Sequence, residues 1–124
     1  SSSVLQGRNW SALSYSSPWA DYNTTDWGSL SYRKIGDLVF VVGMVQRDST
    51  VETNQVIATL PAGYRPGKYN TFIVNCSLGS GSGTWQAARV NVETSGDIRF
   101  VVPYASQKVV WMSLHGIVFS TQAN

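Results

Sequence analysis

Residues 38–46 read LVFVVGMVQ, and this stretch decides the fold of the chain. Seven of its nine residues are apolar and four are valine, a composition typical of a β-strand. The preceding residues 29–35 (SLSYRKI) alternate between apolar and polar side chains with the two-residue period of a strand. Gly36-Asp37 between the two segments suits a tight turn. The sequence therefore predicts a β-hairpin over residues 29–46.

Strand-like segments recur along the rest of the chain. Residues 61–67 (PAGYRPG) hold two prolines and two glycines, which break a helix, and no ten-residue segment carries a helical stripe of apolar side chains. We therefore predict one all-β domain over residues 1–124, an antiparallel β-sandwich or jelly-roll-like barrel of about eight strands. The strands expected beyond the hairpin are 10–15, 56–60, 71–77, 84–92, 98–103 and 109–120.

Two of these strands, 38–46 and 109–120, are apolar on both faces, whereas a strand with one wet face should alternate apolar and polar residues. The second face must also be shielded from water, because burying each such side chain stabilises the protein by about 1.5–3 kcal/mol. We expect a symmetric oligomer to cover it; the alternative is cover by loops and the N-terminal segment of the same chain. In the first strand, Val39, Val41 and Val45 lie opposite Leu38, Phe40, Val42 and Met44; in the second, Val109, Trp111, Ile117 and Phe119 lie opposite Val110, Met112, Leu114 and Val118. Phe40, Met44 and Trp111 are the side chains expected to need cover from another copy.

Charge is sparse in this chain. Charged residues make up 13% of it, the net charge is +2, and no run of Lys or Arg accompanies that charge. Nucleic-acid and anionic-membrane partners are therefore not expected. No apolar stretch is long enough to cross a membrane, and the polar first residues carry no signal-peptide pattern. Such a surface suits a neutral partner such as a sugar, or burial in an oligomer.

Catalytic and metal-binding patterns are missing from the sequence. His115 is the only histidine and Cys76 the only cysteine, so neither a multi-histidine metal site nor a disulfide is expected. We interpret His115 as a packed or interface residue and Cys76 as a buried thiol. Asp37 and Asp97 follow glycines in predicted turns, which explains them without a catalytic role. The sequence thus predicts a protein that is not an enzyme and has no cofactor or metal.

Saccharide binding needs only an aromatic face and a few hydrogen-bonding side chains beside it. Residues 19–23 (WADYN) offer both, the polar segment 47–54 reads as an exposed loop, and Trp85 follows the glycine-rich tip 79–83. The alternative for Trp19 and Trp85 is that they cap the edge of the core. Trp10, Trp27 and Trp111 lie in strand-like stretches and are expected in the core. The predicted glycan-binding residues are Trp19, Asp21, Tyr22, Arg47, Asp48 and Trp85.

Three ordered elements carry a family resemblance. The first is Trp27 followed by 32–37 (YRKIGD) and the apolar strand with Gly43; the second is 57–66 (IATLPAGYRP); the third is 96–98 (GDI) followed by 111–119 (WMSLHGIVF). In this order they resemble the C-terminal receptor-binding head domains of bacteriophage tail-fibre and baseplate proteins, especially of phages that infect Gram-positive hosts. The second element is the most specific of the three.

The resemblance implies a homotrimeric β-head at the tip of a fibre or baseplate in the virion, outside the cell. It also implies non-catalytic binding of a bacterial surface saccharide, such as a cell-wall polysaccharide or teichoic acid, with residues 1–26 linking to a preceding shaft. Receptor-contacting residues are not carried by these motifs. Three alternatives stay open: a monomeric carbohydrate-binding module of an enzyme, a structural virion decoration domain, and a glycan-cleaving tail enzyme.

Overall fold

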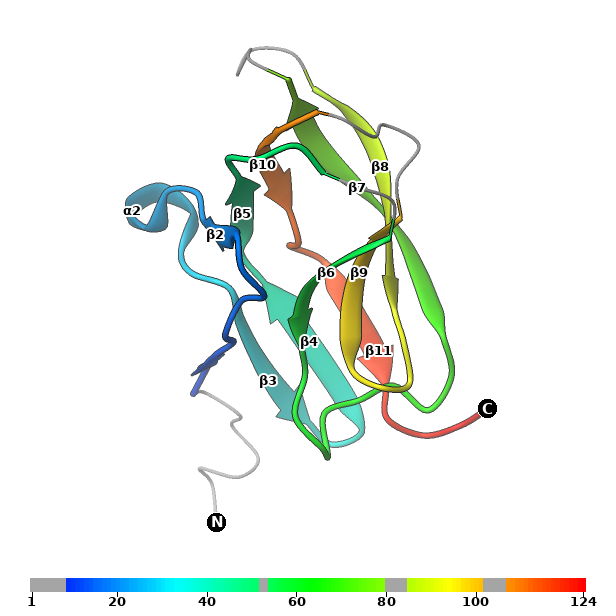
Figure 1. The fold of residues 1–124 in the computed structure, drawn as a ribbon. Helices are drawn as coiled ribbons and strands as arrows, with labels where there is room; N and C mark the ends of the chain where they lie inside the picture. Colours follow the sequence, from blue (N-terminus) through cyan, green and yellow to red (C-terminus); the bar gives the residue numbers. More distant parts are fainter. Residues whose placement is uncertain (1–8, 52–53, 80–84, 102–106) are drawn as a thin grey trace.

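A computed structural model describes residues 9–51, 54–79, 85–101 and 107–124 of the chain. These residues form eleven strands in two antiparallel sheets and one helical turn (Figure 1). The smaller sheet has the order β1-β3-β4-β11 and contains the predicted hairpin, in which Ile35 lies opposite Leu38 across the Gly36-Asp37 turn. Its strands are β1 (Ser11–Ala12), β3 (Ser31–Ile35), β4 (Leu38–Val42) and β11 (Ile117–Ser120).

The larger sheet has seven strands in the order β2-β5-β10-β7-β8-β9-β6 and nearly closes on itself. Tyr15 forms a β-bridge with Ala58 of the last strand, and the Ser16 N–H donates to the Ile57 carbonyl at 2.8 Å. At Trp19 the chain then enters β2, the strand at the opposite edge of the sheet from β6, so the two edges lie close together. The strands are β2 (Trp19–Asp21), β5 (Met44–Arg47), β10 (Val109–Ser113), β7 (Asn70–Leu78), β8 (Gln86–Val92), β9 (Asp97–Val101) and β6 (Gln55–Thr59).

Two long apolar stretches pass from one sheet to the other at the same point. β4 ends and β5 begins at Gly43, and β10 and β11 are separated by residues 114–116. The two interruptions are joined, because the Leu114 N–H donates to the Gly43 carbonyl at 2.8 Å. Gly43 has φ +144°, and a Cβ there would lie 2.7 Å from Cα of Leu30. The bend therefore requires a residue without a side chain.

This change of sheet explains part of the two-faced pattern. Met44 and Val45 are neighbours in sequence, yet they are only 6% and 0% exposed. In the last strand, Met112 and Leu114 are both 0% exposed, and the pairing of β10 with its neighbours shifts between Val109 and Met112. The expectation that Met44 needs cover from another copy was therefore wrong, because the sheet crossing turns this side chain into the core, as the bulge in β10 does for Met112. Trp111, for which the same cover was expected, is half-buried.

A smaller apolar face stays open on the outside of the four-stranded sheet. Leu38 is 46% exposed and Val118 is 40% exposed, while Phe40, directly opposite Val118, is half-buried. Trp10 is 44% exposed, and the guanidinium carbon of Arg33 lies 5.0 Å from the centre of its ring. We call the set Trp10, Ile35, Leu38, Phe40, Val42 and Val118 the outer apolar face. The chain's own described segments leave it in contact with water.

The all-β antiparallel prediction is confirmed, but the number of strands is larger than expected. The expected strands 38–46 and 109–120 each divide in two, and β2 was not foreseen. Residues 23–26, expected as a turn, contribute to the one-turn helix α2 (Thr24–Trp27), which is far shorter than a membrane-crossing helix. Residues 1–8, 80–84 and 102–103, which belong to predicted segments, lie outside the described residues, and the trimer stays a prediction.

The bend predicts a specific sensitivity at Gly43. Gly43→Ala should lower the free energy of unfolding by about 3 kcal/mol, since the added methyl meets the Leu30 backbone in an already strained conformation. Chemical denaturation measures the change. Gly116→Ala is the matched control: Gly116 also has a positive φ, +87°, but a Cβ there would meet nothing within 4 Å. Equal losses in the two variants would contradict the steric argument.

Candidate functional site

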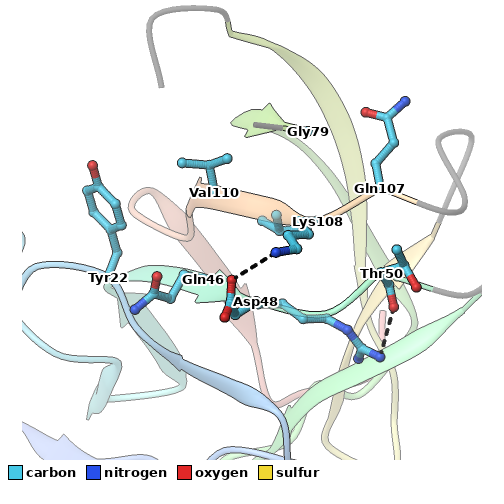
Figure 2. A pocket seen from close by; sticks show the side chains of 10 residues that line it. Tyr22, Gln46, Asp48, Thr50, Gly79, Gln107, Lys108 and Val110 are labelled. Carbon is cyan, nitrogen blue, oxygen red and sulfur yellow. Dashed lines mark hydrogen bonds and ion pairs between the residues drawn. The ribbon is translucent and has the colours of Figure 1, made fainter. Parts of the chain in front are cut away.

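A polar groove opens at the end of the seven-stranded sheet where β5 ends and β10 begins (Figure 2). Its volume is about 610 Å³, within the range typical of ligand sites. Four described segments supply its walls: the end of β5 with the residues that follow, the start of β10 with the two residues before it, and the single residues after β7 and β2. The lining residues are Tyr22, Gln46, Arg47, Asp48, Thr50, Gly79, Gln107, Lys108, Val109 and Val110.

Arg47 is the most constrained of the lining residues. It is 8% exposed, and its guanidinium donates to Gln55 Oε1 at 3.1 Å and to the Thr50 carbonyl at 3.2 Å. The guanidinium carbon also lies 5.6 Å from the centre of the Trp19 ring. Its Nε is buried without a hydrogen-bond partner among the described residues. Among the described residues, the guanidinium has only neutral hydrogen-bond partners. A buried cation of this kind favours an electron-rich ligand group near the groove floor.

The rim of the groove carries opposite charges. Lys108 Nζ lies 3.4 Å from Asp48 Oδ1, and the two side chains are 54% and 97% exposed (Figure 2). Such an exposed pair contributes about 0–1 kcal/mol to stability. Both groups therefore remain available to a ligand at little cost.

Backbone and side-chain contacts between β2 and β5 position Tyr22. The Tyr22 N–H donates to the Met44 carbonyl at 2.9 Å, and Gln46 Nε2 donates to the Asp21 carbonyl at 2.9 Å. The half-buried Tyr22 ring stands at one end of the groove, and the Lys108–Asp48 pair lies between it and Thr50 (Figure 2). The groove thus combines one aromatic ring with amide, hydroxyl, ammonium and carboxylate groups, the mixture that polyhydroxylated ligands require.

No family model matches this sequence, and no curated protein matches it. Two solved structures share its fold. The head domain of the receptor-binding protein of lactococcal phage bIL170 superposes with a TM-score of 0.64 at 17% identity, over 90% of this chain and 96% of that one. The receptor-binding protein of Listeria phage PSA gives a TM-score of 0.64 at 21% identity, over 93% of this chain and 66% of that one.

This chain has the fold of a phage receptor-binding head domain. The resemblance drawn from the sequence motifs is therefore confirmed at the level of the fold. In both comparisons the alignment spans at least nine tenths of this chain.

The head fold brings three of the six predicted residues together and separates the others. Tyr22, Arg47 and Asp48 line the polar groove, although Arg47 is the buried last residue of β5 rather than part of an exposed loop. Trp85 is 68% exposed just before β8 and does not line the groove. Its role as a ligand residue stays a prediction.

Trp19 was predicted wrongly as a ligand residue. It is 4% exposed and packs edge-on against Phe100, with ring centres 6.1 Å apart. The alternative, that it caps the core, is the correct one. Its ring cannot stack on a sugar because Phe100 and Arg47 already cover it.

Asp21 has a structural role that accounts for its position. Its carboxylate accepts hydrogen bonds from the half-buried Tyr15 hydroxyl and, at 3.1 Å, from the Leu30 N–H. Burial, and then the hydrogen bond to Asp21, raise the pKa of Tyr15 above its usual range. The Asp21 carboxylate thus connects Tyr15 of the N-terminal segment to the backbone of Leu30, which Gly43 approaches closely.

Sequence reasoning missed three aromatic residues. Trp27, expected in the core, is 47% exposed, and Trp111 is half-buried. His115, expected to be packed, is exposed. These three side chains line a second hollow that shares Tyr22 with the polar groove. The exposure of Trp27 could have been expected from its position directly after residues 23–26, which were predicted to form a turn.

The described residues contain no cluster of His, Cys, Asp and Glu side chains able to hold a metal ion. Cys76 is buried, and burial raises the pKa of its thiol to about 11. A thiol in this state is a poor nucleophile at neutral pH.

The role of Asp21 can be separated from ligand binding. Asp21→Ala should lower the free energy of unfolding by about 2 kcal/mol, because it leaves the Tyr15 hydroxyl and the Leu30 N–H without an acceptor. Asp37→Ala, which removes an exposed turn carboxylate, should leave the denaturation midpoint nearly unchanged. An Asp21→Ala protein that keeps its stability but loses ligand binding would contradict this account and show that Asp21 is a ligand residue.

Proposed function

We propose that this chain is a phage host-recognition domain that binds a bacterial surface saccharide in the polar groove without cleaving it. The observation that carries the proposal is the groove itself, which gathers Tyr22, Arg47 and Asp48 at one end of the head fold. The two similar structures support it, since each is a receptor-binding protein or domain of a phage.

The chemistry of the groove suits a hydroxyl-rich ligand. Gln46, Gln107 and Thr50 can each donate and accept hydrogen bonds, Lys108 donates, and Asp48 accepts. Tyr22 offers a ring face for the C–H groups of a pyranose. The buried guanidinium of Arg47 favours an oxygen-rich or anionic group deeper in the groove, such as the phosphate of a teichoic acid.

We also propose that three copies associate through the outer apolar face, at the tip of a tail fibre or baseplate outside the cell. Among the described residues of one copy, Trp10, Leu38 and Val118 of this face are 40–46% exposed and its other three side chains are half-buried. A symmetric oligomer would bury all six. Several grooves on one assembly would then bind a repetitive bacterial surface together, which raises the overall avidity well above the affinity of one site.

The binding proposal predicts a loss of attachment when the rim of the groove is removed. The double variant Asp48→Ala with Lys108→Ala should bind bacterial cells about tenfold more weakly, because two charge-assisted contacts disappear while net charge is kept. Labelled protein is applied to a panel of Gram-positive strains, including lactococci and listeriae. Lys34→Ala with Asp37→Ala, at the opposite end of the molecule, is the matched control (Figure 1).

Two outcomes would reject this proposal. One is attachment of the rim variant at wild-type strength to a strain that the wild-type protein binds. The other is release of reducing ends from that strain's polysaccharide, which would indicate a glycan-cleaving enzyme.

The trimer is tested separately by light scattering. The wild-type protein should have three times the 13.6 kDa mass of the chain, and Phe40→Glu should dissociate it, because a carboxylate would be buried among apolar side chains. Ile73→Glu is the control, since Ile73 is 82% exposed on the other sheet. A wild-type protein that runs as a 13.6 kDa monomer would exclude the trimer and favour a monomeric carbohydrate-binding module.

A further inference from the structure

An aromatic cleft adjoins the polar groove on the outer side of the seven-stranded sheet. Its volume is about 340 Å³, and it lies where β5 and β10 approach the crossing between the two sheets. Four of its seven lining residues have aromatic rings, and none is Asp, Glu, Lys or Arg. The lining residues are Tyr22, Trp27, Met44, Asn75, Trp111, Ser113 and His115.

The helix α2 holds Trp27 in this position. Asn23 caps the helix, with its side-chain oxygen accepting from the Asp26 N–H at 3.2 Å, and its amide donates to the Asp26 carboxylate at 2.9 Å. The Trp27 N–H donates to the Asn23 carbonyl at 2.9 Å, and Gly28 ends the helix with φ +75°. A capped single turn that carries a 47% exposed indole at its end contributes little to the core.

The bulge in β10 places Trp111 on the outer side of the sheet. The register of β10 against β7 shifts between Val109 and Trp111. Both Val109 and Met112 consequently point into the core, at 1% and 0% exposed, while Trp111 stays half-buried at the cleft. Asn75 of β7 and Ser113 of β10 add hydrogen-bonding groups beside it.

The groove and the cleft are neighbours but differ in chemistry. Arg47, Asp48 and Lys108 charge the groove, whereas the cleft has aromatic walls and neutral amide and hydroxyl groups, with His115 as its one titratable imidazole. Tyr22 lines both hollows, so the two lie next to each other.

We propose that the aromatic cleft is a second saccharide subsite, which takes the C–H face of an uncharged pyranose linked to the unit in the polar groove. This inference rests on the proposed function and extends it: the receptor is a polymer with at least one neutral pyranose next to the unit held by the charged groove. Stacking on Trp27 and Trp111 would supply affinity, and Asn75 and Ser113 would select the hydroxyl pattern.

The test is a two-dimensional ¹⁵N–¹H NMR titration of the assembled protein with methyl pyranosides at tens of millimolar. The panel comprises the glucoside, galactoside, rhamnoside and N-acetylglucosaminide. The chain has five tryptophans, so its indole N–H signals are separate reporters. With at least one pyranoside, the signals of Trp27 and Trp111 should shift with one shared, saturable dissociation constant, while that of Trp10 should not move.

Variants sharpen the result. Trp27→Ala should weaken pyranoside binding about fivefold, because one stacking face is lost. Tyr69→Ala is the matched control, since Tyr69 is 67% exposed and lines neither hollow.

Three outcomes would overturn the subsite. The first is that no pyranoside moves the Trp27 and Trp111 signals. The second is that Trp10 responds equally, which would mean unspecific stacking. The third is that the cleft signals change only with protein concentration, which would mean that another copy fills it. Attachment to bacteria without pyranoside shifts would reject the subsite alone, whereas pyranoside shifts without attachment to any strain would reject the proposed function alone.

Discussion

The close approach of Gly43 to the backbone of Leu30 is the contact on which the rest of the molecule depends. It allows the apolar stretch that begins in β4 to leave the small sheet and continue as β5 in the large one. The hydrogen bond from Leu114 to Gly43 makes the last strand cross at the same place. Because both crossings coincide, one short chain can build a nearly closed barrel with a small sheet attached to it.

The same crossing positions both hollows. β5 starts at Met44 in the aromatic cleft and ends at Arg47 in the polar groove, and β10 runs beside it in the opposite direction. Tyr22, bonded to the first residue of β5, stands between them. The proposed recognition surface is therefore built on a strand pair, with loop residues around its rim, an arrangement that favours a preorganised site.

The sequence predicted the fold class, and three of the six predicted ligand residues line the candidate groove. The hairpin of β3 and β4 follows from local alternation and turn chemistry, which act within a few residues. The division of the two long strands cannot be predicted in this way, because the alternation of apolar and polar residues does not show where a bulge inserts an extra residue. Trp19 and Trp27 have similar polar neighbours, yet Phe100 covers one and α2 displays the other. Which of them is buried is decided by residues distant in sequence, and a single sequence does not reveal that pairing.

The central claim is that the two hollows recognise a saccharide on a bacterial surface. The most direct measurement uses isolated cell walls from a strain that the protein binds, treated either with periodate, which cleaves the vicinal diols of sugars, or with protease. Binding should be lost after periodate and persist after protease. Binding that survives periodate and disappears after protease would show that the receptor is a protein and contradict the account.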